Sequence, residues 1–257
     1  MIGFFIKKAF FDGWDHLFTL VLLNLAFVAI GAVGILVPGI AGAPAWLGIG
    51  AGLVAALAGT VWYSACAFAL NAVADFGSIR LADMLEALKK GWLPGIQIGA
   101  IGAAAAFLLS IGLPFYLSKG GMIGALAAGI LFWCAIILAL SLQYYIPLRA
   151  RLGGGLRKNL RKSLILFFDN PFFSFFLLLY SLASLAISFF LAFMAPGFAG
   201  MALAGDVALR LRLYKYDWLE ANPEAKRSQV PWEELLAEDR ELVGKRTLKG
   251  MIFPWKE

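Results

Sequence analysis

The sequence predicts an all-α, polytopic membrane protein, and three observations lead to this fold class. The chain of 257 residues is 61% hydrophobic and only 15% charged, which is too apolar for a soluble domain of this length. Its apolar residues gather in runs of about 20 or more, the length of a helix that crosses the hydrocarbon core of a bilayer. These runs lack the two-residue alternation that a transmembrane β-barrel requires.

Six apolar runs meet or approach the length of a membrane-spanning helix. The fourth contains no charged residue, whereas the sixth is short and contains Asp206. Pro/Gly or Lys/Gly turns separate the two runs of each successive pair, so we expect three helical hairpins. They form a predicted membrane domain over 1–209, with spans at about 17–37, 46–73, 93–117, 122–147, 171–194 and 198–214.

The basic residues predict the orientation of these hairpins. Of the 12 Lys and Arg residues before position 210, 11 lie in loops on the same side as the N-terminus, and only Lys119 lies on the other side. Short cytoplasmic loops are enriched in Lys and Arg. We therefore expect both termini in the cytoplasm, with the three hairpins pointing outward.

A pattern also recurs with a spacing of 78 residues. The pairs Gly13-Trp14, Gly91-Trp92 and Asp169-Asn170 each end a short polar stub that precedes a long apolar stretch. A true repeat would predict a parallel, pseudo-threefold bundle with the stubs gathered on the inner face. Simple alternation of stubs and hairpins would give a similar spacing, and both interpretations stay open.

The stubs themselves favour helices that lie in the inner membrane interface. Apolar residues at helical spacing over 79–92 predict one such amphipathic helix. A basic cluster lies on both sides of three glycines, because the segment 149–162 has six basic residues and no acidic one. This basic cluster is a candidate surface for anionic lipid head groups or a partner protein, and it also sets the topology. It consists of Arg149, Arg151, Arg157, Lys158, Arg161 and Lys162.

Residue size predicts which spans lie at the centre of the bundle. The second and third spans have small residues four positions apart, a spacing that lets helix backbones approach closely. The fifth span is rich in phenylalanine. We expect the second and third spans at the centre and the fifth nearer the periphery.

Asp206 is the candidate functional residue within the predicted spans, because an ionisable group is costly to hold in a membrane. Arg210 follows four residues later, so the two side chains can form an ion pair on one helix face. The alternative is a proton or cation role for Asp206. In that case Gln143 and Asn24 would join it in a polar path for a small-solute or ion transporter.

The residues give no support to catalysis or cofactor binding. His16 is the only histidine, which excludes a two-histidine zinc motif, and no nucleotide-binding glycine loop occurs. The two cysteines, Cys66 and Cys134, are too few for a disulfide framework or a metal site. We expect no enzyme activity, no cofactor and no bound metal. Nucleic-acid binding is not expected either, since no recognised motif accompanies the basic residues.

The last 48 residues have a different composition. Residues 210–257 contain 10 Lys or Arg and 9 Asp or Glu, and we expect them to form a charged cytoplasmic tail. One short helix is predicted over 231–243, starting after Pro231 and ending at Gly244. Such a segment cannot bury a core of its own, so it should dock on the inner loops or on a partner. The candidate contact residues are Trp232, Lys245, Arg246 and Trp255.

The stretch Tyr145-Ile146-Pro147-Leu148-Arg149-Ala150-Arg151, with 156–168 and the fifth span after it, resembles the YesL-like family of bacterial membrane proteins. The resemblance covers about 10–205, and the long tail departs from the family's usual short ending. It implies the bacterial inner membrane. The family has no established activity but is associated with carbohydrate uptake systems, which implies an accessory or regulatory partner of a membrane complex such as a carbohydrate ABC transporter. The transporter with a polar path near Asp206 remains the alternative.

Overall fold

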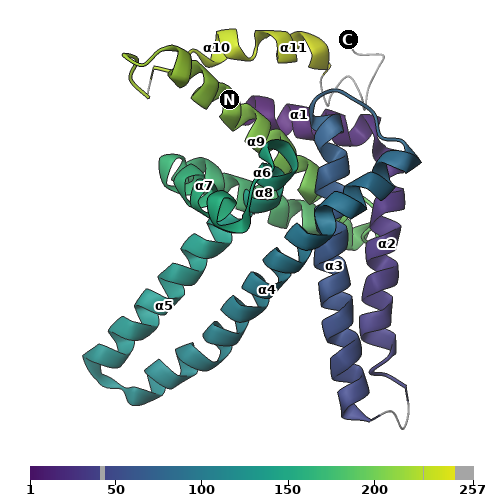
Figure 1. Ribbon diagram of the computed structural model, residues 1–257, viewed down its shortest axis with the longest axis vertical. Helices are drawn as coiled ribbons and strands as arrows, with labels where there is room; N and C mark the ends of the chain where they lie inside the picture. Colours follow the sequence, from purple (N-terminus) through teal and green to yellow (C-terminus); the bar gives the residue numbers. More distant parts are fainter. Residues whose placement is uncertain (41–43, 228, 247–257) are drawn as a thin grey trace.

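The computed structural model describes residues 1–40, 44–227 and 229–246, and all regular structure in these ranges is helical (Figure 1). The predicted all-α class is therefore confirmed. The helices are α1 (Ile2–Asp15), α2 (Leu17–Leu36), α3 (Ala45–Ala74), α4 (Leu81–Lys119), α5 (Gly121–Leu142), α6 (Tyr145–Leu152), α7 (Leu156–Asp169), α8 (Pro171–Phe190), α9 (Gly197–Ala221), α10 (Trp232–Leu235) and α11 (Ala237–Val243).

Five stretches of the described residues are long enough and apolar enough to cross a membrane. They contain α2, α3, α4, α5 and α8, and they correspond to the first five predicted spans. The predicted sixth span, 198–214, falls in α9, which is not among them. Two properties distinguish α9: other helices bury it over 202–209, and its part within 198–214 already contains three charged residues, Asp206, Arg210 and Arg212.

The helices form two long hairpins that extend from a common base (Figure 1). The α2–α3 and α4–α5 hairpins have their turns at one end of the molecule. At the other end lies a layer formed by α1, α6, α7, α9, α10 and α11, which we call the base. Helix α9 lies within this layer and contacts α1, α2, α3, α6 and α8.

Glycine forms the turn between α4 and α5. Gly120 and Gly121 have φ angles of 64° and 67°, in the left-handed region that residues with a Cβ atom rarely adopt. The chain can therefore reverse within two residues. The predicted turn at this position is confirmed.

The first half of α4 packs tightly on α3 through a row of glycines. A Cβ atom added at Gly95 would lie 2.5 Å from the Cα atom of Val61, and one at Gly91 would lie 3.0 Å from the backbone nitrogen of Ala65. The small residues predicted to bring these two spans together do so here. Beyond Gly99, however, α4 leaves α3, and none of residues 99–119 is buried. A central position for the whole third span is wrong, because only its inner end has close-packing partners.

The first half of α8 lies closer to the core than its phenylalanines predicted. Phe5 of α1 makes edge-to-face contacts with Phe173, Phe176 and Tyr180 of α8. Phe172 and Phe190 are exposed, as a peripheral span would have them. The prediction of a peripheral fifth span is therefore wrong for one face of α8, where aromatic packing against α1 replaces lipid contact.

The three predicted stubs differ in structure. The first and third are separate helices, α1 and α7, which end at Asp15 and Asp169. The second, 79–92, is not a separate interfacial helix, because α4 runs from Leu81 to Lys119 without a break and includes Pro94. The third stub ends where it does because Pro171 disfavours a helical conformation at Asn170.

Candidate functional site

Arg210 is the centre of a cluster of charged side chains in the base. Its guanidinium donates hydrogen bonds to the carboxylates of Asp75 and Asp239, the latter at 2.8 Å, and to the Tyr214 hydroxyl at 2.6 Å. Arg151 also binds Asp75, through two guanidinium nitrogens at 3.0 Å. We call these five residues the Asp75 cluster. It joins the end of α3 to α6, α9 and α11.

The expected ion pair between Asp206 and Arg210 is wrong. Arg210 finds two carboxylates from distant segments, whereas Asp206 is fully buried. Neither carboxylate oxygen of Asp206 has a hydrogen-bond partner among the described residues. An ionised carboxylate is costly to bury in this way.

Lys8 and Asp12 of α1 form a second buried pair, with 2.9 Å between Nζ and Oδ2. Burial lowers the pKa of Lys8 and raises the pKa of Asp12, because it disfavours the charged form of each group. The Lys8 ammonium lies 3.3 Å from the centre of the Phe76 ring, a cation–π contact that offsets part of this cost. Phe76 has a φ angle of 61°, a strained value for a residue other than glycine.

Asp169 is the centre of another cluster, at the junction of α7 and α8. It accepts hydrogen bonds from Lys215 at 2.7 Å, from the Tyr216 hydroxyl at 2.7 Å and from Arg227 at 2.6 Å. Burial raises the pKa of Asp169, but the hydrogen bonds of Lys215 and Tyr216 and the charges of Lys215 and Arg227 together outweigh it, so the pKa is lowered. Asn170 also accepts a hydrogen bond from Arg212, at 2.8 Å.

Sequence reasoning did not identify Asp75, Asp239 or Asp169 as site residues. Each lies beside the end of a helix, where a charged residue is ordinary. Their partners come from segments far away in the chain, as with Arg210 and Asp75, which are 135 positions apart. No local pattern signals such a pairing.

Gln143 and Asn24, the other predicted intramembrane polar residues, stabilise backbone groups. The Gln143 amide donates to the carbonyl oxygens of Leu140 and Ser174, both at 2.8 Å. Asn24 donates to the Pro196 carbonyl at 2.8 Å and accepts from the Ala199 amide at 2.9 Å, which fixes the start of α9. Within the described part of the chain, no hydrogen bond joins either amide to Asp206.

The structure divides the predicted basic cluster. Arg151 belongs to the Asp75 cluster, Arg149 is half-buried, and Gly153 and Gly154 then separate α6 from α7. The remaining residues lie on α7, where Lys162 is half-buried and three cations are exposed without an ion-pair partner among the described residues. These three are Arg157, Lys158 and Arg161.

The charged tail docks on the base. The predicted helix over 231–243 is present as α10 and α11, with a break at Leu236. Trp232 lies 5.8 Å from the Arg212 guanidinium, and Arg246 forms an ion pair with Asp15 at 2.8 Å. Lys245 is exposed, and Trp255 lies outside the described residues.

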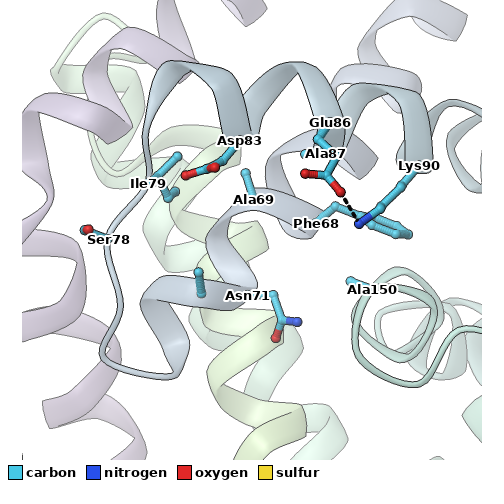
Figure 2. A pocket seen from close by; sticks show the side chains of 11 residues that line it. Phe68, Ala69, Asn71, Ser78, Ile79, Asp83, Glu86, Ala87, Lys90 and Ala150 are labelled. Atoms are coloured by element: carbon cyan, nitrogen blue, oxygen red, sulfur yellow. Dashed lines mark ion pairs between the residues drawn. The ribbon is translucent and has the colours of Figure 1, made fainter.

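A small polar pocket of about 290 Å³ lies between α3, the first turns of α4, and α6 (Figure 2). Glu86 and Lys90 pair across one helical turn at 2.6 Å, and Asp83 accepts a hydrogen bond from the Arg80 amide at 2.8 Å. Asn71 lies on the opposite wall, and its Oδ1 atom has no partner among the described residues. The charged groups of this pocket are thus largely engaged with their own helix.

A larger, mostly apolar groove of about 750 Å³ lies between α1, α2, α8 and α9. We call it the α1–α8 groove. Trp14, Leu17 and Ile187 are among its apolar walls, and two cations, Lys7 and Arg246, also line it. It differs from the polar pocket in size and in chemistry.

Neither a protein-family model, nor a curated protein, nor a solved structure matches this chain. Among the described residues, no group of three or more His, Cys, Asp or Glu side chains is placed to hold a metal ion.

Proposed function

We propose that the protein is a non-enzymatic accessory or regulatory subunit of a membrane complex in the bacterial inner membrane. The predicted orientation places the base in the cytoplasm and the hairpin turns outside. The resemblance described above implies a carbohydrate ABC transporter as the partner. The protein would contribute a membrane hairpin and a charged cytoplasmic face to the complex, and it would not catalyse a reaction.

One observation carries this proposal: the outer part of the α4–α5 hairpin has no packing partner besides itself in the described structure. Between residues 100 and 139, only Gly124 and Ala128 are buried. Large apolar side chains such as Phe107 and Trp133 are 64% and 62% exposed. Lipid can cover such a surface, but small residues next to bulky ones also suit the helices of another membrane protein.

Helix α7 supports the same proposal from the base. Arg157 and Arg161 are exposed on it, and Ile165 and Phe168 are 52% and 64% exposed further along. A helix that presents cations and then apolar residues suits the membrane interface or a partner that lies there. Because α7 contacts α5, a partner bound to the α4–α5 hairpin would also be within reach of α7.

Site-specific photo-crosslinking in native membranes tests the proposal. A photoreactive residue replaces Phe107 on α4, and another replaces Phe190 at the far end of α8, which is 84% exposed, as the matched control. We expect a discrete protein adduct from position 107 and lipid adducts alone from position 190. Lipid adducts alone at both positions would contradict a partner on the hairpin.

Charge reversal tests the contribution of α7. The triple change Arg157→Glu, Lys158→Glu and Arg161→Glu should abolish co-purification of the crosslinked partner. The matched control reverses three exposed cations elsewhere, Lys89, Lys226 and Arg240. Equal co-purification by the two triple variants would remove α7 from the interface.

A second function, small-solute or ion transport, is favoured by one specific observation. Asp206 is 0% exposed and both of its carboxylate oxygens lack a hydrogen-bond partner among the described residues. An unpaired buried carboxyl is a common feature of proton relays in membrane proteins. Proton-coupled uptake into reconstituted vesicles should then be lost in Asp206→Asn, and the absence of uptake by the wild type would end this hypothesis.

A further inference from the structure

The α1–α8 groove combines a long apolar lining with a cationic end. Its volume of about 750 Å³ lies within the usual range of ligand sites, about 300–1,000 Å³. Ile6 and Phe10 of α1 form one wall, and Ala183 and Ile187 of α8 form another. Most of the polar groups of the lining belong to Tyr180, Ser184 and the two cations.

The groove is open to the surroundings of the protein. Trp14 is 50% exposed, Ile187 is 56% exposed and Leu191 is 52% exposed. Two of its four helices, α2 and α8, are among the candidate membrane spans. If these two helices cross a bilayer, the open side of the groove faces the bilayer, and the molecules that can enter it are lipids.

The cationic end carries a net positive charge. The Lys7 ammonium donates a hydrogen bond to the carbonyl oxygen of Gly244 at 2.8 Å, a neutral partner that leaves its charge uncompensated. Arg246 lies two residues after Gly244 and is paired with Asp15, and the exposed Lys245 lies between them. The docked tail therefore brings cations to the rim of an apolar groove on α1.

We propose that the α1–α8 groove binds an anionic phospholipid of the membrane, with an acyl chain against α1 and α8 and the phosphate beside Lys7 and Arg246. An apolar groove alone would accept any acyl chain. The uncompensated charge of Lys7 selects an anionic head group over a zwitterionic one. This site is separate from the exposed basic residues of α7, and it stands whether or not the protein is an accessory subunit.

Native mass spectrometry of the full-length protein tests the proposal. The protein is purified in mild detergent and supplied with an equimolar mixture of phosphatidylglycerol and phosphatidylcholine. We expect one phosphatidylglycerol molecule to remain bound in preference to phosphatidylcholine. Lys7→Gln keeps a hydrogen-bond donor for Gly244 and should weaken retention of phosphatidylglycerol about fivefold, the contribution of one basic residue near an anionic surface. Lys226→Gln, an exposed cation outside the groove and outside α7, should leave it unchanged.

A second pair of variants tests the apolar part of the groove. Ala183 and Ala186 are both exposed on α8, but only Ala183 is part of the groove lining. Ala183→Trp should fill the groove and abolish retention of both lipids, whereas Ala186→Trp should bind phosphatidylglycerol like the wild type. If Ala183→Trp does not fold, Gly3→Leu replaces it. Gly3 lines the groove from α1, and a Cβ atom added there would meet nothing within 4 Å, so a larger side chain can be accommodated.

Three results would overturn the proposal. The first is equal retention of the two lipids by the wild type. The second is unchanged retention of phosphatidylglycerol in Ala183→Trp, or in Gly3→Leu where that variant replaces it. The third is a wild type that retains no lipid. If that wild type forms dimers, the groove is assigned to a second copy of the chain. If it binds phosphatidylglycerol only after residues 247–257 are deleted, the groove is assigned to the chain's own C-terminal segment.

Discussion

The base and the outer part of the α4–α5 hairpin belong to one chain but follow different physical rules. In the base, α9 is buried over 202–209, and Arg210, Asp75 and Asp239 join α9 to the end of α3 and to α11 through charged hydrogen bonds. Between residues 100 and 139 of the hairpin, nearly every side chain is at least partly exposed. The hairpin extends away from the base as a pair of helices (Figure 1).

This difference matches the surroundings that the proposed orientation gives each region, water for the base and lipid for the hairpin. In water, apolar surface must be buried, so the base needs a packed interior and partners for its charges. In lipid, exposed apolar side chains cost little, and a helix already satisfies its own backbone groups. A hairpin can therefore stand apart in a membrane without loss of stability, and its surface remains free for another helix.

The largest effect should come from breaking the Asp75 cluster. Arg210→Met leaves Asp239, whose side chain is 2% exposed, without its charged partner. We expect a loss of about 4 kcal/mol in the free energy of unfolding, as for other broken buried ion pairs. Titration with dodecyl sulfate measures it, and Arg240→Met, exposed on α11, is the control. An equal loss in both variants would show that the cluster does not hold the base together.

Two leucine truncations compare the regions directly. Leu209 in α9 is fully buried and Leu108 in α4 is 58% exposed. Leu209→Ala should lower the free energy of unfolding by about 3 kcal/mol, because it leaves a cavity in the base. Leu108→Ala should change it by less than about 0.5 kcal/mol, as is usual for surface positions. Similar losses in the same titration would mean that the outer hairpin is packed after all.

Two glycines on α4 locate the boundary between the regions. Gly95→Ala should cost about 2 kcal/mol from overpacking, because the new Cβ would lie 2.5 Å from the Val61 Cα atom. Gly102→Ala meets nothing within 4 Å and should be neutral or slightly stabilising. Thermal unfolding in detergent, followed by circular dichroism, compares the two. Equal stability of both variants would argue against the close contact of α3 and α4.

The smallest expected effect is a dependence on pH that belongs to the base. The pKa of Asp169 is lowered in the folded protein. As the pH falls below about 4, this carboxylate is therefore protonated in the unfolded chain before it is protonated in the folded one. The stabilisation from Asp169 is present above that pH and is lost as the pH falls through the lower, folded pKa. Asp169→Asn should remove about 1.5 kcal/mol of this acid-sensitive stability, the scale of hydrogen bonds to a charged group.

Unfolding titrations between pH 6 and pH 3 measure this contribution as the difference between wild type and variant. Asp217→Asn, exposed on α9, provides the control. Parallel pH profiles for all three proteins would contradict the role assigned to Asp169.

Sequence reasoning predicted the parts of this structure that depend on local pattern. The long apolar runs predicted α2, α3, α4, α5 and α8, and Pro231 and Gly244 predicted the tail helix to within a break at Leu236. The glycines of α4 predicted close packing on α3. Sequence reasoning was wrong about α9. Its apolar residues resemble those of a membrane span, but other helices bury it over 202–209, and its charged residues Asp206 and Arg212 lie in the interior of the protein.

The site depended almost entirely on contacts between distant segments. The i,i+4 spacing of Asp206 and Arg210 favours a pair on one helix, but Arg210 instead binds Asp75 and Asp239. Likewise, Lys7 and Arg246 come together only because the tail docks on α1.

By itself, the sequence determined the class of the protein. Composition and the length of the apolar runs show how much apolar surface would be unfavourable in contact with water. Only the tertiary structure decided which charges are paired, which helix is buried and where a groove opens. A charged side chain has many possible partners of the opposite sign, and the choice among them depends on how helices far apart in the chain pack together.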